Sequence, residues 1–186
     1  MTSDILFEPD FVTDSLRLFV RLLEQVTWDD RMRSRKTACY GEAYNYSDMT
    51  YATAAMHPLL VPIVDALERK LVYRSNNCLL NYYEDGGSTM GFHSDSEDDL
   101  MAGTGVAIIS LGAERALTFR SKREKSVRDF PLPSGSLLYM PPGIQQTWKH
   151  AILRQEGVGG PSVLPSGSFE MWRHRRPEHF IHNLRI

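Results

Sequence analysis

The strongest constraint on the fold is a change of pattern near residue 77. Before that point, residues 14–26 and residues 58–71 place apolar side chains at helical spacing. After it, short runs of β-type residues alternate with Gly, Pro and Asp. These runs cover residues 78–83, 106–111, 116–119, 136–140 and either 169–172 or 180–186. Helices followed by closely spaced strands predict an α+β fold, a sandwich or jelly roll with the helices packed on one face.

The composition is that of one globular domain. Of the 186 residues, 42% are hydrophobic and 24% are charged, with a formal net charge of −2, which excludes a disordered, collagen-like or coiled-coil chain. No apolar run approaches the roughly 20 residues that span a bilayer, and the N-terminus lacks the basic segment of a signal peptide. Cys39 and Cys78 are too few for a disulfide scaffold. We therefore expect a monomeric, single-domain cytoplasmic protein, with N-terminal helices in residues 1–76 and a β core in residues 77–186.

The most informative motif is His93-Ser94-Asp95. In an extended strand, residues i and i+2 point to the same face, so His93 and Asp95 can reach one metal ion together. His150, which follows the predicted strand over residues 136–140, is the best candidate for a third ligand. Two histidines and one carboxylate form the facial triad of non-haem Fe(II) oxygenases. By itself, the motif is weak evidence and is more typical of a solvated surface turn.

The sequence around this motif resembles the AlkB-like dioxygenases, which depend on 2-oxoglutarate and Fe(II). Residues 81–95, NYYEDGGSTMGFHSD, resemble the signature segment of that family. Further segments resemble the family in the same order along the chain. They are residues 110–120 (SLGAERALTFR), 132–140 (LPSGSLLYM) and 146–152 (QTWKHAI), with residues 35–41 and 44–47 resembling the substrate side. An ordered set of segments is far more specific than the short metal motif.

The resemblance implies a double-stranded β-helix core, with Fe(II) held by His93, Asp95 and His150 and with 2-oxoglutarate and O₂ as co-substrates. Asn81 and Tyr83 match the positions that hydrogen-bond 2-oxoglutarate in this family. Their i, i+2 spacing places both side chains on one face of a strand.

The distal carboxylate of 2-oxoglutarate needs a cation, and the planar guanidinium of arginine suits it. In this family the arginine lies on the last core strand, in a motif like Arg-x-Ser/Asn-x-Thr-Phe-Arg. The closing residues 179–186 depart from that pattern, although Arg185 and Asn183 fit its last positions. A second alignment uses residues 169–173 and makes Arg173 the anchor. We favour Arg185 and keep Arg173 as the alternative.

For family members that act on alkylated bases, the resemblance implies oxidation of an N-methyl group and its loss as formaldehyde, on a base that is flipped out or single-stranded. Tyr40, Tyr44 and Tyr46 are then candidates for stacking on the base. Glu97 matches an acidic residue that reaches toward the substrate, although its place in a run of acids is equally typical of a solvated charged surface. Arg120 begins a basic stretch, residues 120–128, that we expect to form a hairpin near the site.

The substrate class stays open at this level. The net charge provides no overall attraction to nucleic acid, so alkylated DNA or RNA would be held by local basic patches. A protein side chain or a small metabolite is an alternative substrate for the same chemistry. A non-catalytic binding module is disfavoured because all three candidate metal ligands are present.

Overall fold

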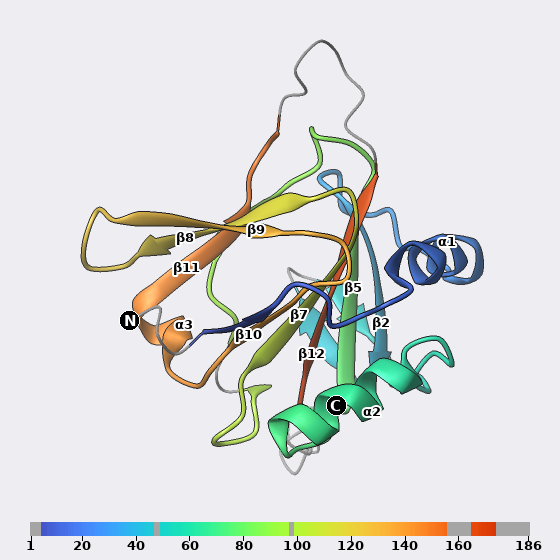
Figure 1. Ribbon diagram of the computed structural model, residues 1–186. Coiled ribbons are helices and arrows are strands. Elements are labelled where there is room, and N and C mark those ends of the chain that lie inside the picture. The colour runs from blue at the N-terminus through green and yellow to red at the C-terminus, as the bar shows by residue number, and fades with distance from the viewer. Residues whose placement is uncertain (1–4, 47–48, 97–98, 156–164, 174–186) are drawn as a thin grey trace, which may run out of the picture.

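The computed structural model describes residues 5–46, 49–96, 99–155 and 165–173, and two antiparallel sheets dominate it (Figure 1). The larger sheet has, in spatial order, β1 (Leu6–Glu8), β10 (Leu137–Met140), β7 (Val106–Gly112), β12 (Ser166–Trp172), β5 (Asn77–Tyr83) and β2 (Lys36–Gly41). The smaller sheet has β6 (Met90–His93), β11 (Trp148–Ile152), β8 (Arg115–Ser121) and β9 (Val127–Leu132). A separate hairpin pairs β3 (Tyr44–Tyr46) with β4 (Met49–Tyr51). This arrangement confirms the expected jelly-roll-like core.

Both long helices cover the outer face of the larger sheet, as the sequence predicted. They are α1 (Ser15–Gln25) and α2 (Val61–Leu71), and Figure 1 shows them far from the tip of the β8–β9 hairpin. Phe19 of α1 and Leu67 of α2 share one buried cluster with Ile109 of β7 and Phe169 of β12. Burying a side chain of this size stabilises the fold by about 1.5–3 kcal/mol. No helix in the described part of the chain is long and apolar enough to cross a membrane.

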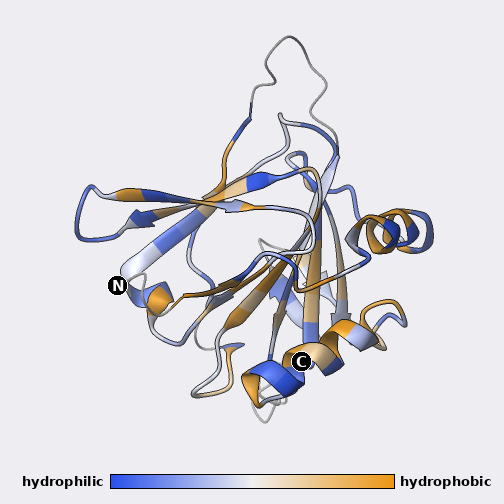
Figure 2. Ribbon diagram, in the orientation of Figure 1, coloured by the Kyte–Doolittle hydropathy of each residue, from blue (hydrophilic) through white to orange (hydrophobic). Residues whose placement is uncertain are grey.

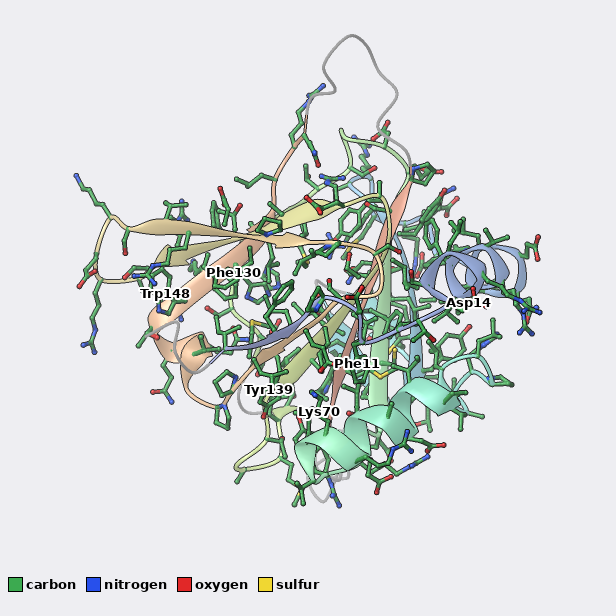
Figure 3. The ribbon with its side chains drawn as sticks, in the orientation of Figure 1. Phe11, Asp14, Lys70, Phe130, Tyr139 and Trp148 are labelled. Atoms are coloured by element: carbon green, nitrogen blue, oxygen red, sulfur yellow. The ribbon has the colours of Figure 1, made fainter. Side chains whose placement is uncertain are left out.

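A second buried cluster fills the space between the two sheets. It joins Leu79 and Tyr83 of β5 to Phe119 of β8 and Trp148 of β11, with Phe130 packed at its margin. Figure 3 labels Phe130 and Trp148 among the side chains of the smaller sheet. Figure 2 shows hydrophobic residues along the core strands and hydrophilic ones toward the tip of the β8–β9 hairpin. The inter-sheet space is the layer that holds the candidate site.

Two boundaries differ from the sequence prediction because of proline. The second helix begins at Val61, so Pro62 lies in its first turn and Pro58 lies in the turn before it. Proline is tolerated in a first turn because the missing N–H would have no helical partner there. The prediction also missed β9, which contains Pro131. This strand lies at the edge of the smaller sheet, where proline costs no ladder hydrogen bond.

The last described strand starts earlier than expected. The segment over residues 154–168 reads as a loop, but Ser166 and Gly167 already belong to β12. Small residues are needed there because α1 packs closely against the sheet. A Cβ added at Gly167 would lie 3.0 Å from the ring of Phe19, and one at Gly112 would lie 2.7 Å from it. The expected strand over residues 169–172 is confirmed, while residues 180–186 lie outside the described residues.

Candidate metal centre

Strand pairing brings the three predicted metal ligands together. β6 and β11 are neighbours, and their register places His150 opposite His93, with ring centroids 4.3 Å apart. Asp95 lies just beyond the end of β6. Its Oδ1 is 3.4 Å from Nε2 of His93, and its Oδ2 is 3.8 Å from Nε2 of His150. One ligand atom from each residue lies within 4.8 Å of the other two, so the three side chains can hold a single ion.

The two imidazoles are prepared for metal binding. Nε2 of His93 and Nε2 of His150 are buried without a hydrogen-bond partner among the described residues. Nδ1 of His93 lies 2.9 Å from the carbonyl oxygen of Gly91, which favours a proton on Nδ1 and leaves the Nε2 lone pair for a metal. Burial lowers the pKa of His150 to about 4, so this imidazole is neutral at neutral pH. The donor set fits Fe(II).

The carboxylate of Asp95 stays ionised at neutral pH. Burial alone would raise its pKa, but His150, His93 and a hydrogen bond from Gln145 outweigh burial and lower it. Gln145 was not predicted from the sequence. The sequence feature that could have indicated it is a polar residue in the segment that leads to His150. The structure buries this residue.

The facing wall of the site comes from β5. Asn81 and Tyr83 are each 1% exposed and point into the inter-sheet space, as their spacing predicted. Nε of Arg35 donates to Oδ1 of Asn81 at 2.7 Å, and Nδ2 of Asn81 lies 3.4 Å from Oε1 of Glu170. The guanidinium of Arg115 lies 5.6 Å from the ring centroid of Tyr83. Arg35 and Glu170 were not predicted as site residues from the sequence, because only the pairing of β2, β5 and β12 brings them to Asn81.

The inward positions of β12 are Ser168, Glu170 and Trp172. Glu170 and Trp172 line a small pocket that also includes Asp95 and Tyr44. The rings of Tyr44 and Trp172 meet edge to face, with centroids 4.9 Å apart. Burial raises the pKa of Glu170 to about 7. This stretch of strand therefore brings a carboxyl group, not a cation, to the site.

The arginines proposed to anchor 2-oxoglutarate are only partly described by the structure. Arg185 and Asn183 lie outside the described residues and stay predictions. Arg173 directly follows β12, and its main-chain oxygen accepts a hydrogen bond from the backbone of Met101. By strand alternation it shares the side of Phe169, which packs toward the helices. The described part of β12 thus gives no support to Arg173 as the anchor.

The structure does not bring Tyr40 to the pocket. Its ring packs against the helix-side cluster and meets His57 edge to face, with centroids 5.4 Å apart. Tyr44, four residues later, packs on the inter-sheet cluster and lines the pocket instead. Side chains of neighbouring residues in β2 point to opposite faces of the sheet. Which of the two faces meets the site depends on where the helices pack.

The other predicted substrate contacts are only partly placed. Glu97 lies outside the described residues. Tyr46 ends β3, so its backbone belongs to the hairpin that contains Tyr44. Arg120 lies on the outer face of the smaller sheet, with its guanidinium 4.0 Å from the ring centroid of Phe92. It borders the metal centre without pointing into it.

Comparison with known proteins decides the family. The model of the 2OG-Fe(II) oxygenase superfamily matches residues 14–184. The chain belongs to this superfamily. DNA oxidative demethylase ALKBH2 of Homo sapiens is 34% identical over 140 residues, which cover 69% of this chain and 54% of that protein. Alpha-ketoglutarate-dependent dioxygenase alkB homolog 3 of Rattus norvegicus is 29% identical over 155 residues, covering 73% of this chain and 52% of the relative.

These relatives place the chain among the AlkB-like oxygenases, as the motifs indicated, and the chain spans about half the length of the curated relatives it matches. The solved structure of OsALKBH1 superimposes with a TM-score of 0.68 over 91% of this chain and 97% of that one. At 15% identity, this match shows the shared fold. The match to the 2OG-Fe(II) oxygenase family over residues 14–184, together with the clustered His93, Asp95 and His150, indicates Fe(II) as the cofactor and 2-oxoglutarate as the co-substrate.

Proposed function

We propose that this AlkB-like oxygenase removes N-alkyl groups from nucleic-acid bases. The cofactor supplies C–H hydroxylation, in which O₂ and 2-oxoglutarate are consumed and succinate and CO₂ are released. One oxygen atom enters succinate and the other is placed on the alkyl carbon. An N-methyl group thereby becomes N-hydroxymethyl, which collapses to formaldehyde and an N–H. His93, Asp95 and His150 would hold the metal, with Asn81 and Tyr83 beside the co-substrate.

The observation that carries the proposal is a basic hairpin next to the metal centre. We use the name basic hairpin for residues 120–128, which join β8 to β9. Phe119 pairs with His150 across the smaller sheet, so the hairpin begins one residue beyond the partner of a metal ligand. Its charged residues are Arg120, Lys122, Arg123, Lys125 and Arg128 against the single acid Glu124. Such a local patch attracts phosphates although the whole chain carries a net charge of −2.

The relatives support the same substrate class. A protein named as a DNA oxidative demethylase is among those that match this chain. Chemistry on a base requires it to leave the stack, so the substrate would be an extruded or single-stranded base. Among the described residues, Tyr44 and Trp172 supply aromatic surface in the small pocket beside Asp95.

The direct test follows product formation. The protein is incubated with Fe(II), 2-oxoglutarate and methylated DNA or RNA oligonucleotides, and methyl loss, formaldehyde and succinate are measured by mass spectrometry. We expect succinate to rise with the methylated strand and methyl loss to match it. Turnover that does not depend on oligonucleotides but rises with a methylated protein or a metabolite would reject the nucleic-acid substrate. It would leave the assignment as an oxygenase unchanged.

Binding gives a second test with a matched control. The double variant R123Q/K125Q removes two charges from the basic hairpin, whereas R17Q/R21Q removes two from α1 on the far side of the molecule. We expect the hairpin variant to weaken oligonucleotide binding. The slope of log K against log salt should also fall by roughly 0.7 for each phosphate of a single strand that the hairpin no longer neutralises. Equal effects of the two variants would show that the hairpin has no special role.

A further inference from the structure

Asp95 is the metal ligand that strand pairing does not position. His93 and His150 are fixed by the ladder between β6 and β11. Asp95 lies in residues 94–96, which belong to no helix or strand. A carboxylate on irregular backbone needs other contacts to keep one orientation, since ligand geometry depends on the groups that hydrogen-bond the ligand.

Gln145 supplies those contacts. It lies in the short helix α3 (Ile144–Thr147) and is 4% exposed. Its Nε2 donates to Oδ2 of Asp95 at 2.8 Å, and its Oε1 accepts from the backbone N–H of Asp95 at 3.1 Å. One amide thus holds both the main chain and the carboxylate of the same residue. Only a side chain with a donor and an acceptor side by side can make this pair of bonds.

The hydrogen bond to Oδ2 also distinguishes the two carboxylate oxygens. Oδ1 is the oxygen that lies closer to Nε2 of His93, at 3.4 Å. With Oδ2 engaged by Gln145, Oδ1 is the oxygen available for a monodentate bond to the ion. The amide therefore sets the rotation of the carboxylate as well as its position.

The basic hairpin in turn holds α3. Nζ of Lys122 donates to the main-chain oxygen of Gln145 at 2.6 Å, and the backbone N–H of Lys122 donates to the main-chain oxygen of Thr147 at 2.9 Å. A four-residue helix has little stability of its own. These two bonds fix its position relative to the smaller sheet.

We propose that Gln145 is a positioning residue for the iron ligand Asp95, and that Lys122 supports it from the basic hairpin. Gln145 does not touch the ion. It acts by holding the carboxylate of Asp95 beside both imidazoles, with Oδ1 3.4 Å from Nε2 of His93 and Oδ2 3.8 Å from Nε2 of His150. The proposal concerns metal binding alone, so it stands or falls independently of the substrate.

The test titrates the metal-free protein with Mn(II) at pH 8 and measures its dissociation constant by calorimetry. We expect Q145L to bind Mn(II) about 10–100-fold more weakly, the range for removing a hydrogen-bond partner of a metal ligand. Q145E separates positioning from charge, because it adds a negative charge near the ion but replaces the donor with an acceptor facing Asp95. Positioning predicts weaker binding in Q145E. Unchanged or tighter binding in either variant would overturn the proposal.

Substitution of Lys122 provides a milder test, and substitution of Lys125 provides the control. Lys122 and Lys125 are both exposed in the basic hairpin, so neither change threatens the core. We expect K122M to weaken Mn(II) binding about 2–5-fold, as for the removal of one hydrogen bond, and K125M to leave it unchanged. The visible spectrum of the Co(II)-loaded protein should shift in Q145L and K122M and not in K125M, because ligand geometry changes only in the first two. Equal affinities and spectra in K122M and K125M would remove the hairpin from the proposal.

Discussion

The two walls of the active site differ in how they are built. The smaller sheet contributes His93 and His150, with Asp95 just beyond a strand end, and these ligand atoms lie within 4.8 Å of one another. The larger sheet contributes a buried hydrogen-bonded group, in which Asn81 links Arg35 to Glu170. The first wall collects two imidazole nitrogens and one carboxylate for a cation. The second buries one cation beside one acid.

This difference fits what each wall would bind. A metal ion would compensate the carboxylate of the first wall, so its ligands would need no protein cation. If 2-oxoglutarate lies against the second wall, its free carboxylate requires positive charge in a buried place. Among the described residues, Arg35 is the buried arginine bonded to the side chain of Asn81. Arg115 is also buried, but its guanidinium donates to three backbone carbonyls, those of Asp85, Ser88 and Leu153.

The largest expected effect concerns the first wall, which contains the candidate metal ligands. Asp95→Ala removes the only carboxylate of the triad and should weaken Mn(II) binding by at least roughly 100-fold, beyond the effect of removing a partner of a ligand. Calorimetric titration of the metal-free protein measures this change. His57→Ala is the control, because His57 packs against Tyr40 near the helices. If Asp95→Ala still bound Mn(II) as tightly as the unmodified protein, the triad would not be the metal site.

The next effect concerns the acid of the second wall. The pKa of Glu170 is raised from 4.5 to about 7, so folding favours its protonated form. Its contribution to stability is fully present below pH 4.5 and is lost as the pH rises to 7. At one pKa unit per 1.36 kcal/mol, the loss above pH 7 is about 3 kcal/mol. Glu170→Gln keeps an oxygen that accepts the hydrogen bond from Asn81 and removes the loss of stability at high pH.

We therefore expect Glu170→Gln to stabilise the metal-free protein by about 3 kcal/mol at pH 8 and by less than about 1 kcal/mol at pH 5. Urea unfolding at the two pH values measures the difference. The exposed Glu114→Gln serves as the control. The same gain at both pH values would show that Glu170 does not titrate between them.

A somewhat smaller effect concerns the cation of the second wall. We expect Arg35→Met to weaken 2-oxoglutarate binding about 10-fold, which corresponds to about 1.4 kcal/mol and to the lower end for a charged hydrogen bond. Anaerobic calorimetry of the Fe(II)-loaded protein measures it. Arg173→Met is the matched comparison and should bind as the unmodified protein does. The reverse ranking would favour Arg173 as the anchor, and a loss confined to Arg185→Met would favour Arg185.

The two walls also differ in how far the sequence predicted them. His93 and Asp95 are two residues apart, so local spacing identified them, and the family resemblance pointed to His150. The same two-residue periodicity placed Asn81 and Tyr83 on one face of a strand, and the structure turns that face toward the inter-sheet space. Arg35 and Glu170 lie 135 residues apart in sequence, and they meet only through the pairing of β2, β5 and β12. No local pattern contains that information.

The fold shows the same division between local and long-range information. Apolar spacing predicted α1 and α2 to within a few residues, because a helix face is a local property. β9 escaped detection because Pro131 reads as a break, and proline is acceptable only once the strand is known to lie at an edge. β12 was predicted too short because Ser166 and Gly167 read as loop residues. The small size of Gly167 is required by Phe19, which is more than 140 residues away in sequence.

The smallest effect concerns two tyrosines on opposite sides of the larger sheet. Tyr44 meets Trp172 edge to face in the pocket, a contact worth about 0.5–1.5 kcal/mol, whereas Tyr40 packs near the helices. If the substrate is a base, Tyr44→Ala should raise KM for a methylated oligonucleotide roughly 2–10-fold, in line with that energy. Tyr40→Ala should lower the unfolding temperature and leave KM unchanged. A rise in KM with Tyr40→Ala alone would show that the substrate approaches from the helix side, and that the pocket beside the metal is not where the base lies.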